Sequence, residues 1–229
     1  MNRYNSQTRY PTFNRLVAYI NVLGQFLFLG GSWLSATSIV WHVILCGLAF
    51  VLADFVNGLV HLYMDQNDHY TGFIGALVAA FHLHHNSLRY QDKPIWRIYI
   101  DESGYKVWLA MLQIMTAMAW WAHAVPAPLL GFLSYFFIFS SLAEVSHFLC
   151  HNSRSTWVKH LQSAHILLPL QHHMRHHILD NVNYAFLNGL SDPLINRIAQ
   201  YCSTGYATTT DKHSALYLHN QQINDKHTP

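Results

Sequence analysis

Histidines are crowded into one short stretch of this chain, from His165 to His177, which reads HILLPLQHHMRHH. The stretch holds five of the eighteen histidines. Neutral imidazole is the most common protein ligand for transition metals, and residues three or four apart share one face of a helix. His173, His176 and His177 can therefore converge on one ion. Because the cluster is internal and interleaved with Leu, Met and Arg, it indicates a metal site rather than an expression tag.

Three further groups of potential ligands occur earlier in the chain. They are His61 with Asp65, the doublet His84–His85, and His147 with His151. A spacing of four residues places both members of the first and third groups on one helical face. Together with the cluster above, the groups hold more histidines than one ion accepts, so two metal ions are the simplest interpretation. Imidazole ligands suit iron, copper or zinc, whereas magnesium or calcium would require more carboxylates.

Carboxylates near these histidines have two possible roles. Asp65 and Glu144 could bind metal directly, or each could accept the free ring N–H of a histidine that binds metal. The sequence leaves both roles open.

The composition of the chain indicates an integral membrane protein. Charged residues make up 10% of the 229 residues and hydrophobic residues 52%, whereas soluble domains carry about a quarter charged residues. The net charge of +2 and the scattered basic residues disfavour nucleic acid as a partner. The three cysteines lie far apart, which disfavours a disulfide framework or a zinc knuckle.

Four apolar stretches are predicted to span the membrane, at residues 16–34, 39–62, 105–124 and 129–149. Asp54 and His61, late in the second stretch, must face a protein interior or a watery cavity. A shorter apolar segment, residues 73–81, is expected to lie at the interface and to lead into His84 and His85. The expected fold class is all-α and integral to the membrane, with four transmembrane helices and a cytoplasmic histidine-rich cap.

The basic residues predict the orientation of the chain in the membrane. All thirteen Lys and Arg residues lie before the first stretch, in or beside residues 63–106, or after the fourth stretch. Because basic loops favour the cytoplasmic side, both termini and every histidine group are expected there. Residues 1–15 and 202–229 are expected to be tails, the second one disordered, around a single domain at 16–201. His42 and His123 lie apart from the groups and are interpreted as structural.

The order of the motifs resembles that of a known family. The motifs are DFVNGLVHxxxD (Asp54 to Asp65), FHLHH (Phe81 to His85), HFLCH (His147 to His151) and LQSAHILLPLQHHMRHH (Leu161 to His177). They resemble the plasmanylethanolamine desaturase family, also called Kua or CarF, and are similar to the plant plastid palmitate desaturase that acts on phosphatidylglycerol. The resemblance covers most of residues 50–197, including NYAFLNGLSDPL. Two features depart from it: Phe81 stands where a full HxxHH box would begin, and NSLRYQDKP replaces a short Asp-Pro motif.

The resemblance implies an O2-dependent oxidoreductase that introduces a double bond into the alkyl or acyl chain of a phospholipid, forming a vinyl ether when the substrate is plasmanylethanolamine. It implies that two iron ions (Fe2+/Fe3+) are held by His61, His84, His85, His147, His151, His173, His176 and His177, with His165, His172 and Asp65 as further candidates. Electrons would come from a separate cytochrome b5 or ferredoxin, because the chain has no GxGxxG or haem-attachment motif. The membrane would be a bacterial inner membrane, or the endoplasmic reticulum or a plastid of a eukaryote.

Other functions remain open at the level of sequence. A lipid hydroxylase on the same scaffold would differ only in how the substrate chain is placed. A non-enzymatic metal transporter or a haem protein is less favoured, because the histidines crowd at one face instead of following a path through the membrane. A zinc hydrolase would need fewer ligands and an HExxH-type base, which the sequence lacks. Apolar residues that could line a substrate tunnel, or simply pack, are Met111, Met115, Met118, Tyr135 and Phe136.

Overall fold

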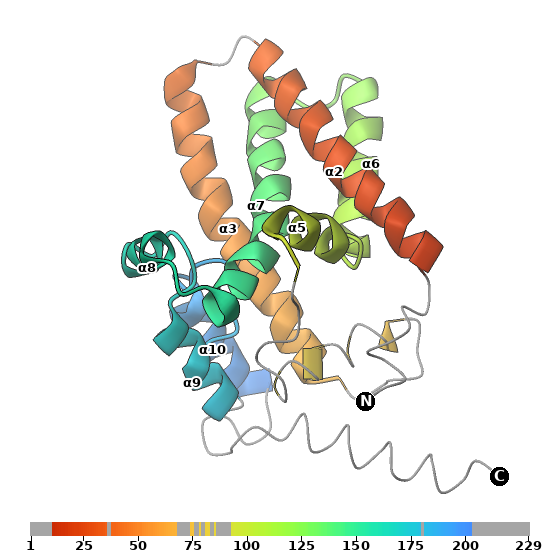
Figure 1. The fold of residues 1–229 in the computed structure, drawn as a ribbon. Helices are drawn as coiled ribbons and strands as arrows, with labels where there is room; N and C mark the ends of the chain where they lie inside the picture. Colours follow the sequence, from red (N-terminus) through yellow and green to blue (C-terminus); the bar gives the residue numbers. More distant parts are fainter. Residues whose placement is uncertain are drawn as a thin grey trace, which may run out of the picture.

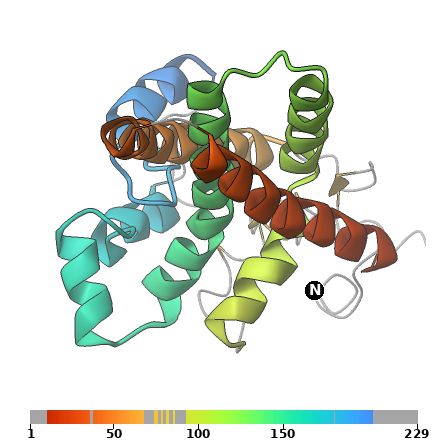
Figure 2. The ribbon, with the colours of Figure 1, turned by 90° about the horizontal axis from the view of Figure 1, so that it is seen from above.

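All regular secondary structure in the described residues is α-helical. The computed structural model describes residues 11–35, 38–67, 74–75, 78, 81–82, 85, 93–179 and 181–202. Four helices run alongside one another in the upper part of Figure 1: α2 (Pro11–Leu34), α3 (Ile39–Asp65), α6 (Val107–Trp121) and α7 (Ala127–Asn152). Four shorter helices are α5 (Ile95–Ser103), α8 (Thr156–Ser163), α9 (Leu170–Ile178) and α10 (Asp192–Cys202). Viewed from above, α8, α9 and α10 lie on one side of α7 and α6 lies on the other (Figure 2).

Three of the helices are long and apolar enough to cross a membrane. They are Thr12–Leu34 within α2, then α3 and α7, with 23, 27 and 26 residues and mean hydropathies of 1.4, 2.3 and 1.6. At 1.5 Å per residue, each exceeds the roughly 30 Å of a bilayer's hydrocarbon layer. Large apolar side chains such as Phe26, Val43 and Leu48 are exposed on these helices, as expected for surfaces that face lipid. The first, second and fourth predicted stretches therefore form helices of spanning length.

The third apolar stretch forms a shorter helix than the sequence predicts. Residues 105–124 are expected to be one span, but α6 has 15 residues, which measure roughly 22 Å. The helix begins only at Val107 because Lys106 turns into the protein interior, where it is 5% exposed. The helix ends at Trp121, and the chain then turns through His123, whose φ is 56°.

Several predicted features lie outside the described residues. These are His84, most of the segment at 73–81, and residues 1–10 and 203–229 of the predicted tails. Of the interfacial segment, one helical hydrogen bond is described, from the Val78 N–H to the Ile74 carbonyl at 3.0 Å.

Close packing of α3 on α7 forms the centre of the fold. Ala49 and Ala53 on α3 are fully buried, and small side chains at such positions let two helices approach closely. Phe137 and Ala143 on α7 belong to the same buried cluster. This pairing matters for the site, because the lower ends of α3 and α7 carry His61 and His147.

Polar side chains of α2 tie it to the rest of the bundle. The Asn21 amide donates to the Ser103 carbonyl at 2.7 Å, and the Gln25 amide donates to Ser141 Oγ at 2.8 Å. Gln113 on α6 donates to Asn21 Oδ1 at 3.0 Å. Buried polar groups that are paired in this way select one arrangement of helices over alternatives with similar apolar packing.

Asp54 explains how the last part of the chain is held against α3. Its carboxylate is fully buried and accepts hydrogen bonds from the backbone N–H groups of residues 187, 188, 189 and 191 at 3.0–3.3 Å, and from Ser191 Oγ at 2.6 Å. These bonds compensate the cost of burying a charge. Asp54 therefore fastens the loop before α10 to the helix that carries His61.

The backbone of this loop lies close to α3 at Gly58. A Cβ atom added there would lie 2.4 Å from Ile195 Cδ1 and 3.1 Å from Ala185 Cα. A Cβ added to Gly47, on the same helix, would meet nothing within 4 Å. The two glycines are therefore a matched pair, one in close contact and one in open space.

We expect Gly58→Ala to lower the thermal stability of the detergent-solubilised protein and Gly47→Ala to leave it unchanged or raise it. Overpacking a buried contact costs about 1–3 kcal/mol, whereas Ala in an open helical position costs nothing. Thermal melts of the two variants and the wild type measure the difference. Equal melting temperatures for the two variants would contradict this packing.

Candidate metal centre

Two groups of four potential ligand atoms lie side by side at the lower ends of α3 and α7. One consists of His147, His151, His173 and His177, and the other of His61, Asp65, His85 and His176. In each group the four ligand atoms lie within 4.8 Å of one another. All eight residues are 9% exposed or less. Such compact, desolvated sets are the arrangement that metal ions require.

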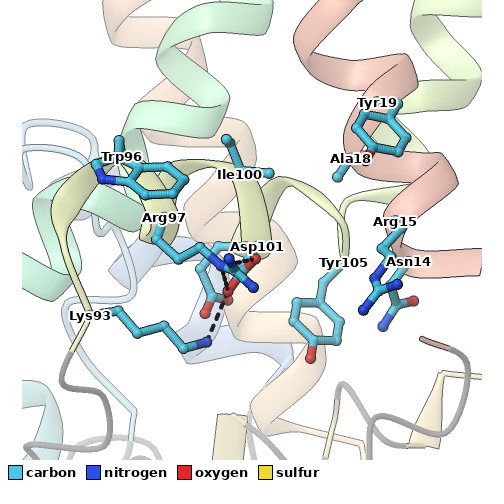
Figure 3. A pocket seen from close by; sticks show the side chains of 11 residues that line it. Asn14, Arg15, Ala18, Tyr19, Lys93, Trp96, Arg97, Ile100, Asp101 and Tyr105 are labelled. Carbon is cyan, nitrogen blue, oxygen red and sulfur yellow. Dashed lines mark hydrogen bonds and ion pairs between the residues drawn. The ribbon is translucent and has the colours of Figure 1, made fainter. Parts of the chain in front are cut away.

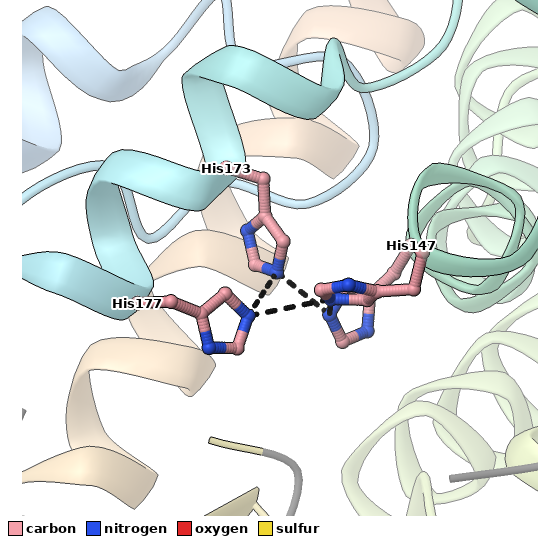
Figure 4. Close-up of side chains that lie close together, drawn as sticks. His147, His173 and His177 are labelled. Atoms are coloured by element: carbon pink, nitrogen blue, oxygen red, sulfur yellow. Dashed lines mark hydrogen bonds between the residues drawn. The ribbon is translucent and has the colours of Figure 1, made fainter. Parts of the chain in front are cut away.

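The all-histidine group is built from two helical pairs with four-residue spacing. His147 and His151 come from α7, and His173 and His177 come from α9. Figure 4 shows the rings of His173 and His177 pointing toward His147. The Nε2 atom of His173 is 2.9 Å from that of His147 and 3.1 Å from that of His177. His151 Nε2 is 3.2 Å from His147 Nε2 and 3.3 Å from His177 Nε2. Ligands about 2.0–2.1 Å from a tetrahedral ion are roughly 3.4 Å apart, so this spacing suits one ion.

The second group combines three histidines with a carboxylate. Asp65 Oδ2 is 3.2 Å from His61 Nε2, 3.3 Å from His176 Nε2 and 3.8 Å from His85 Nε2. His176 Nε2 also lies 3.2 Å from His85 Nε2. Asp65 therefore faces three imidazole nitrogens from three separate parts of the chain.

Helix α9 serves both groups, which the sequence did not predict. His173, His176 and His177 were expected to converge on one ion, yet His176 belongs to the other group. At 100° per residue, His173 and His177 are about 40° apart around the helix, whereas His176 and His177 are about 100° apart. Adjacent histidines therefore point into neighbouring groups, and the two groups lie next to each other.

Backbone carbonyls fix the orientation of two of the rings. His61 Nδ1 is 2.8 Å from the Tyr184 carbonyl, and His176 Nδ1 is 2.8 Å from the Val182 carbonyl. Because a carbonyl oxygen can only accept, each Nδ1 carries the proton and donates it. The Nε2 atom of a neutral ring then presents a lone pair, as in histidines that bind metals.

The chemistry of the second group fits a cation. The lone pairs on Nε2 of His61 and His176 both face the carboxylate of Asp65 in a space closed to solvent. Electron-rich atoms that lie so close repel each other unless a positive charge stands between them. Imidazole with one carboxylate suits iron and the neighbouring transition metals better than magnesium or calcium.

Three of the α9 histidines, His173, His176 and His177, lie in surroundings that favour the neutral ring. Burial, aided by the neighbouring imidazoles, lowers the pKa of His176 to about 4. The same causes hold the pKa of His173 well below its ordinary value and lower that of His177. Neutral rings keep the lone pairs that metal binding needs, so protons compete weakly with a metal at neutral pH.

Two candidates from the sequence lie apart from both groups. His165 is exposed in a turn with φ of 52°. His172 Nε2 is 2.6 Å from Asp192 Oδ2, and Asp192 Oδ1 accepts the Ala185 N–H at 2.8 Å. His172 therefore supports the loop whose carbonyls orient His61 and His176. Glu144, considered as a partner for a histidine, instead lies 3.0 Å from Lys106 Nζ.

The residues considered for a substrate tunnel divide into two sets. Met111, Met115 and Met118 are 59–61% exposed on the outer face of α6, so they face outward and do not line the space between helices. Phe136 is buried in the core of the bundle, and Tyr135 packs against the same core from a partly buried position.

A groove of about 600 Å³ lies away from the histidines, between the N-terminal part of α2 and the length of α5 (Figure 3). Arg15 and Tyr19 line it from α2, and Trp96 and Arg97 line it from α5. Asp101 lies in its floor and accepts hydrogen bonds from Lys93 at 2.9 Å and from Arg97 Nε at 3.1 Å. None of the eight ligand residues lines this groove.

The region of the chain that contains both groups matches a known protein family. The model of the lipid desaturase domain matches residues 50–205, a range that contains every residue of both groups. The chain belongs to the lipid desaturase domain family. No curated protein and no solved structure matches it. Membership confirms the expected oxidoreductase class at the level of the lipid desaturases, and it implies a lipid substrate with O2 and an electron donor.

Replacing His176 and His177 of α9 one at a time tests whether the two groups are separate metal sites. His176→Ala should remove metal from the group with Asp65, and His177→Ala should remove it from the all-histidine group. Each variant is expected to keep about half of the wild-type metal, measured by elemental analysis of protein purified in detergent. His165→Ala, at an exposed turn, is the control and should keep all of it. Unchanged metal in both histidine variants would contradict the assignment.

The depressed pKa values also predict how pH affects the metal-free protein. Between about pH 4 and the ordinary value of 6.5, the unfolded chain protonates His176 whereas the folded chain does not. Stability is therefore lost as the pH falls through this range, by about 1 kcal/mol for each such histidine at pH 5.5. Thermal melts of metal-stripped protein at pH 7.5 and 5.5 measure the loss. His173→Gln should make the melting temperature depend less steeply on pH. A melting temperature that rises from pH 7.5 to pH 5.5 would refute the predicted loss of stability.

Proposed function

We propose that this protein is an O2-dependent di-iron desaturase that introduces a double bond into the alkyl or acyl chain of a membrane phospholipid. The observation that carries the proposal is the pair of adjacent four-ligand groups within the region that matches the lipid desaturase domain. Iron accepts both imidazole and carboxylate ligands, and two groups allow two ions. The ligands would be the eight residues of the two groups, with His84 of the FHLHH motif as a further ligand.

We further propose that α6 is the fourth helix within the membrane. It packs on α2 and α7 and exposes a row of apolar side chains, including Met111, Ile114 and Met118. The basic residues favour a cytoplasmic position for both termini and for the metal centre. The short helices α5, α8, α9 and α10 then belong to the cytoplasmic side, around the lower ends of α3 and α7.

The depth of the ligands supports oxidation near the polar end of the lipid. The helical rise places His61 roughly 33 Å from the first residue of α3, and His147 roughly 30 Å from the first residue of α7. Both therefore lie close to the edge of a hydrocarbon layer roughly 30 Å thick. A bond next to the glycerol backbone reaches this level without bending the chain. This favours a plasmanylethanolamine desaturase-like reaction that yields a vinyl ether.

In this reaction, removal of two hydrogens from adjacent carbons, together with two electrons and two protons from outside, reduces O2 to two waters. The iron ions would supply the storage and transfer of electrons. The protein's own residues hold and orient the centre: carbonyls of Val182 and Tyr184 fix two rings, and Asp65 balances positive charge. Burial of the ligands excludes bulk water, which protects a reactive centre from side reactions. A cytochrome b5 or a ferredoxin would deliver the electrons.

Mass spectrometry of lipids after turnover tests the proposal. Iron-loaded protein in liposomes that contain ether and diacyl phospholipids is supplied with O2 and a reduced ferredoxin or cytochrome b5. The expected product is lighter than its substrate by two hydrogen atoms, and a vinyl ether product is cleaved by mild acid. His177→Ala should lower turnover by at least about 100-fold.

The same experiment separates the alternatives. A product that gains one oxygen atom would replace the proposed reaction with hydroxylation. Unchanged lipids, in protein shown to hold iron, would refute a lipid oxidation function for these substrates.

A further inference from the structure

A buried ion pair lies one helical turn on the membrane side of the two ligand groups. The Lys106 ammonium is 3.0 Å from Glu144 Oε1 on α7 and 2.5 Å from Asn57 Oδ1 on α3. The side chains of Lys106 and Glu144 are 6% and 13% exposed, and Asn57 is fully buried. Ionisable groups at such a depth are costly and usually mark function. Neither belongs to the two ligand groups.

The partners of Lys106 are in register with the metal-binding residues. Asn57 precedes His61 by four residues on α3, and Glu144 precedes His147 by three residues on α7. Residues with these spacings share a helical face. One ammonium group, placed at the start of α6, therefore links the two helices a single turn away from their first ligands.

Phe186 connects this ion pair to both groups. The Lys106 ammonium lies 5.2 Å from the centre of the Phe186 ring, within the range of a cation–π contact. The same ring is 5.6 Å from the His61 ring and 5.8 Å from the His147 ring, measured between centroids. Phe186 thus contacts one histidine of each group and has the ammonium group as a third neighbour.

The chemistry of this arrangement favours positioning over proton transfer. The neighbour that the ammonium shares with His61 and His147 is the Phe186 ring, and a phenyl ring carries no proton that could be relayed. Stability alone is also a weak reason for the pair, because apolar residues of similar size often replace a buried ion pair at no cost. The ion pair instead sets the relative position of two helices, because it fixes one point on α3 and one on α7.

We propose that Lys106 is a positioning residue for the two-metal centre. Through Asn57 and Glu144, Lys106 holds α3 and α7 at a set separation. Its ammonium group also keeps the Phe186 ring in contact with His61 and His147. The inference rests on the proposed function, because it assumes that both groups hold metal. It adds a residue outside the metal ligands that determines how the two ions sit relative to each other.

A paired apolar replacement tests this role. Lys106→Met combined with Glu144→Met removes both charges, keeps the side-chain volumes similar and leaves no unpaired buried charge. The iron-loaded variant is expected to bind as much metal as the wild type and to melt within a few degrees of it. Its Mössbauer spectrum should show a changed quadrupole splitting and a changed coupling between the irons, and kcat should fall at least about tenfold while KM stays nearly constant.

Two further variants control the experiment. Tyr135→Phe removes the hydrogen bond of Tyr135 to His42, 2.9 Å long, at the other end of α7, and should leave the iron spectrum unchanged. Phe186→Leu keeps the ion pair but removes the ring that contacts Lys106, His61 and His147. It should bind metal and shift the spectrum in the same way as the paired replacement, and it decides the matter if that variant does not fold.

The outcomes separate this inference from the function on which it rests. Wild-type metal content, spectrum and turnover in both the paired variant and Phe186→Leu would overturn the positioning role and leave the proposed function intact. Loss of metal in step with loss of thermal stability would also overturn it, since that is the behaviour of a purely structural pair. A wild-type protein that cannot hold two irons would refute both.

Discussion

Electron-rich atoms converge in a buried space in this protein, and a cation placed among them would remove their mutual repulsion. Four imidazole nitrogens meet in one group, and three imidazoles meet the Asp65 carboxylate in the other. Burial removes the water that would otherwise screen their repulsion. The carbonyls of Val182 and Tyr184 add to the constraint, because they hold two rings with their lone pairs turned inward. Most other features of the fold can be understood as means to keep these atoms together.

The helices and the loop around the two ligand groups hold these atoms close together. The lower ends of α3 and α7 bring the first ligands together, and α9 completes the centre by contributing to both groups. Carbonyl groups of the loop at residues 181–191 orient the rings of His61 and His176. Backbone N–H groups of the same loop donate to Asp54, and His172 supports the loop through its contact with Asp192. In a lipid desaturase, this arrangement would let the substrate chain reach the metal centre from the bilayer.

The sequence predicted what depends on local periodicity. Spacings of four residues placed His61 beside Asp65 and His147 beside His151, and apolar runs located three helices of spanning length. The sequence could not show that His176 serves a different group from His177, because that depends on where α9 sits relative to α3 and α7. The hydrogen bond from Ser191 to Asp54 and the ion pair of Lys106 with Glu144 join residues far apart in the chain, so no local pattern reveals them. The sequence also could not show that α6 is shorter than expected, because the helix starts only after Lys106, which makes a tertiary contact with Glu144.

We propose that each of the two groups holds one metal ion. Anomalous X-ray diffraction from crystals of the iron-loaded protein, recorded on both sides of the iron absorption edge, tests it most directly. Two anomalous peaks are expected, one among His147, His151, His173 and His177 and one among His61, Asp65, His85 and His176. A single peak, or peaks that lie away from these residues, would contradict it.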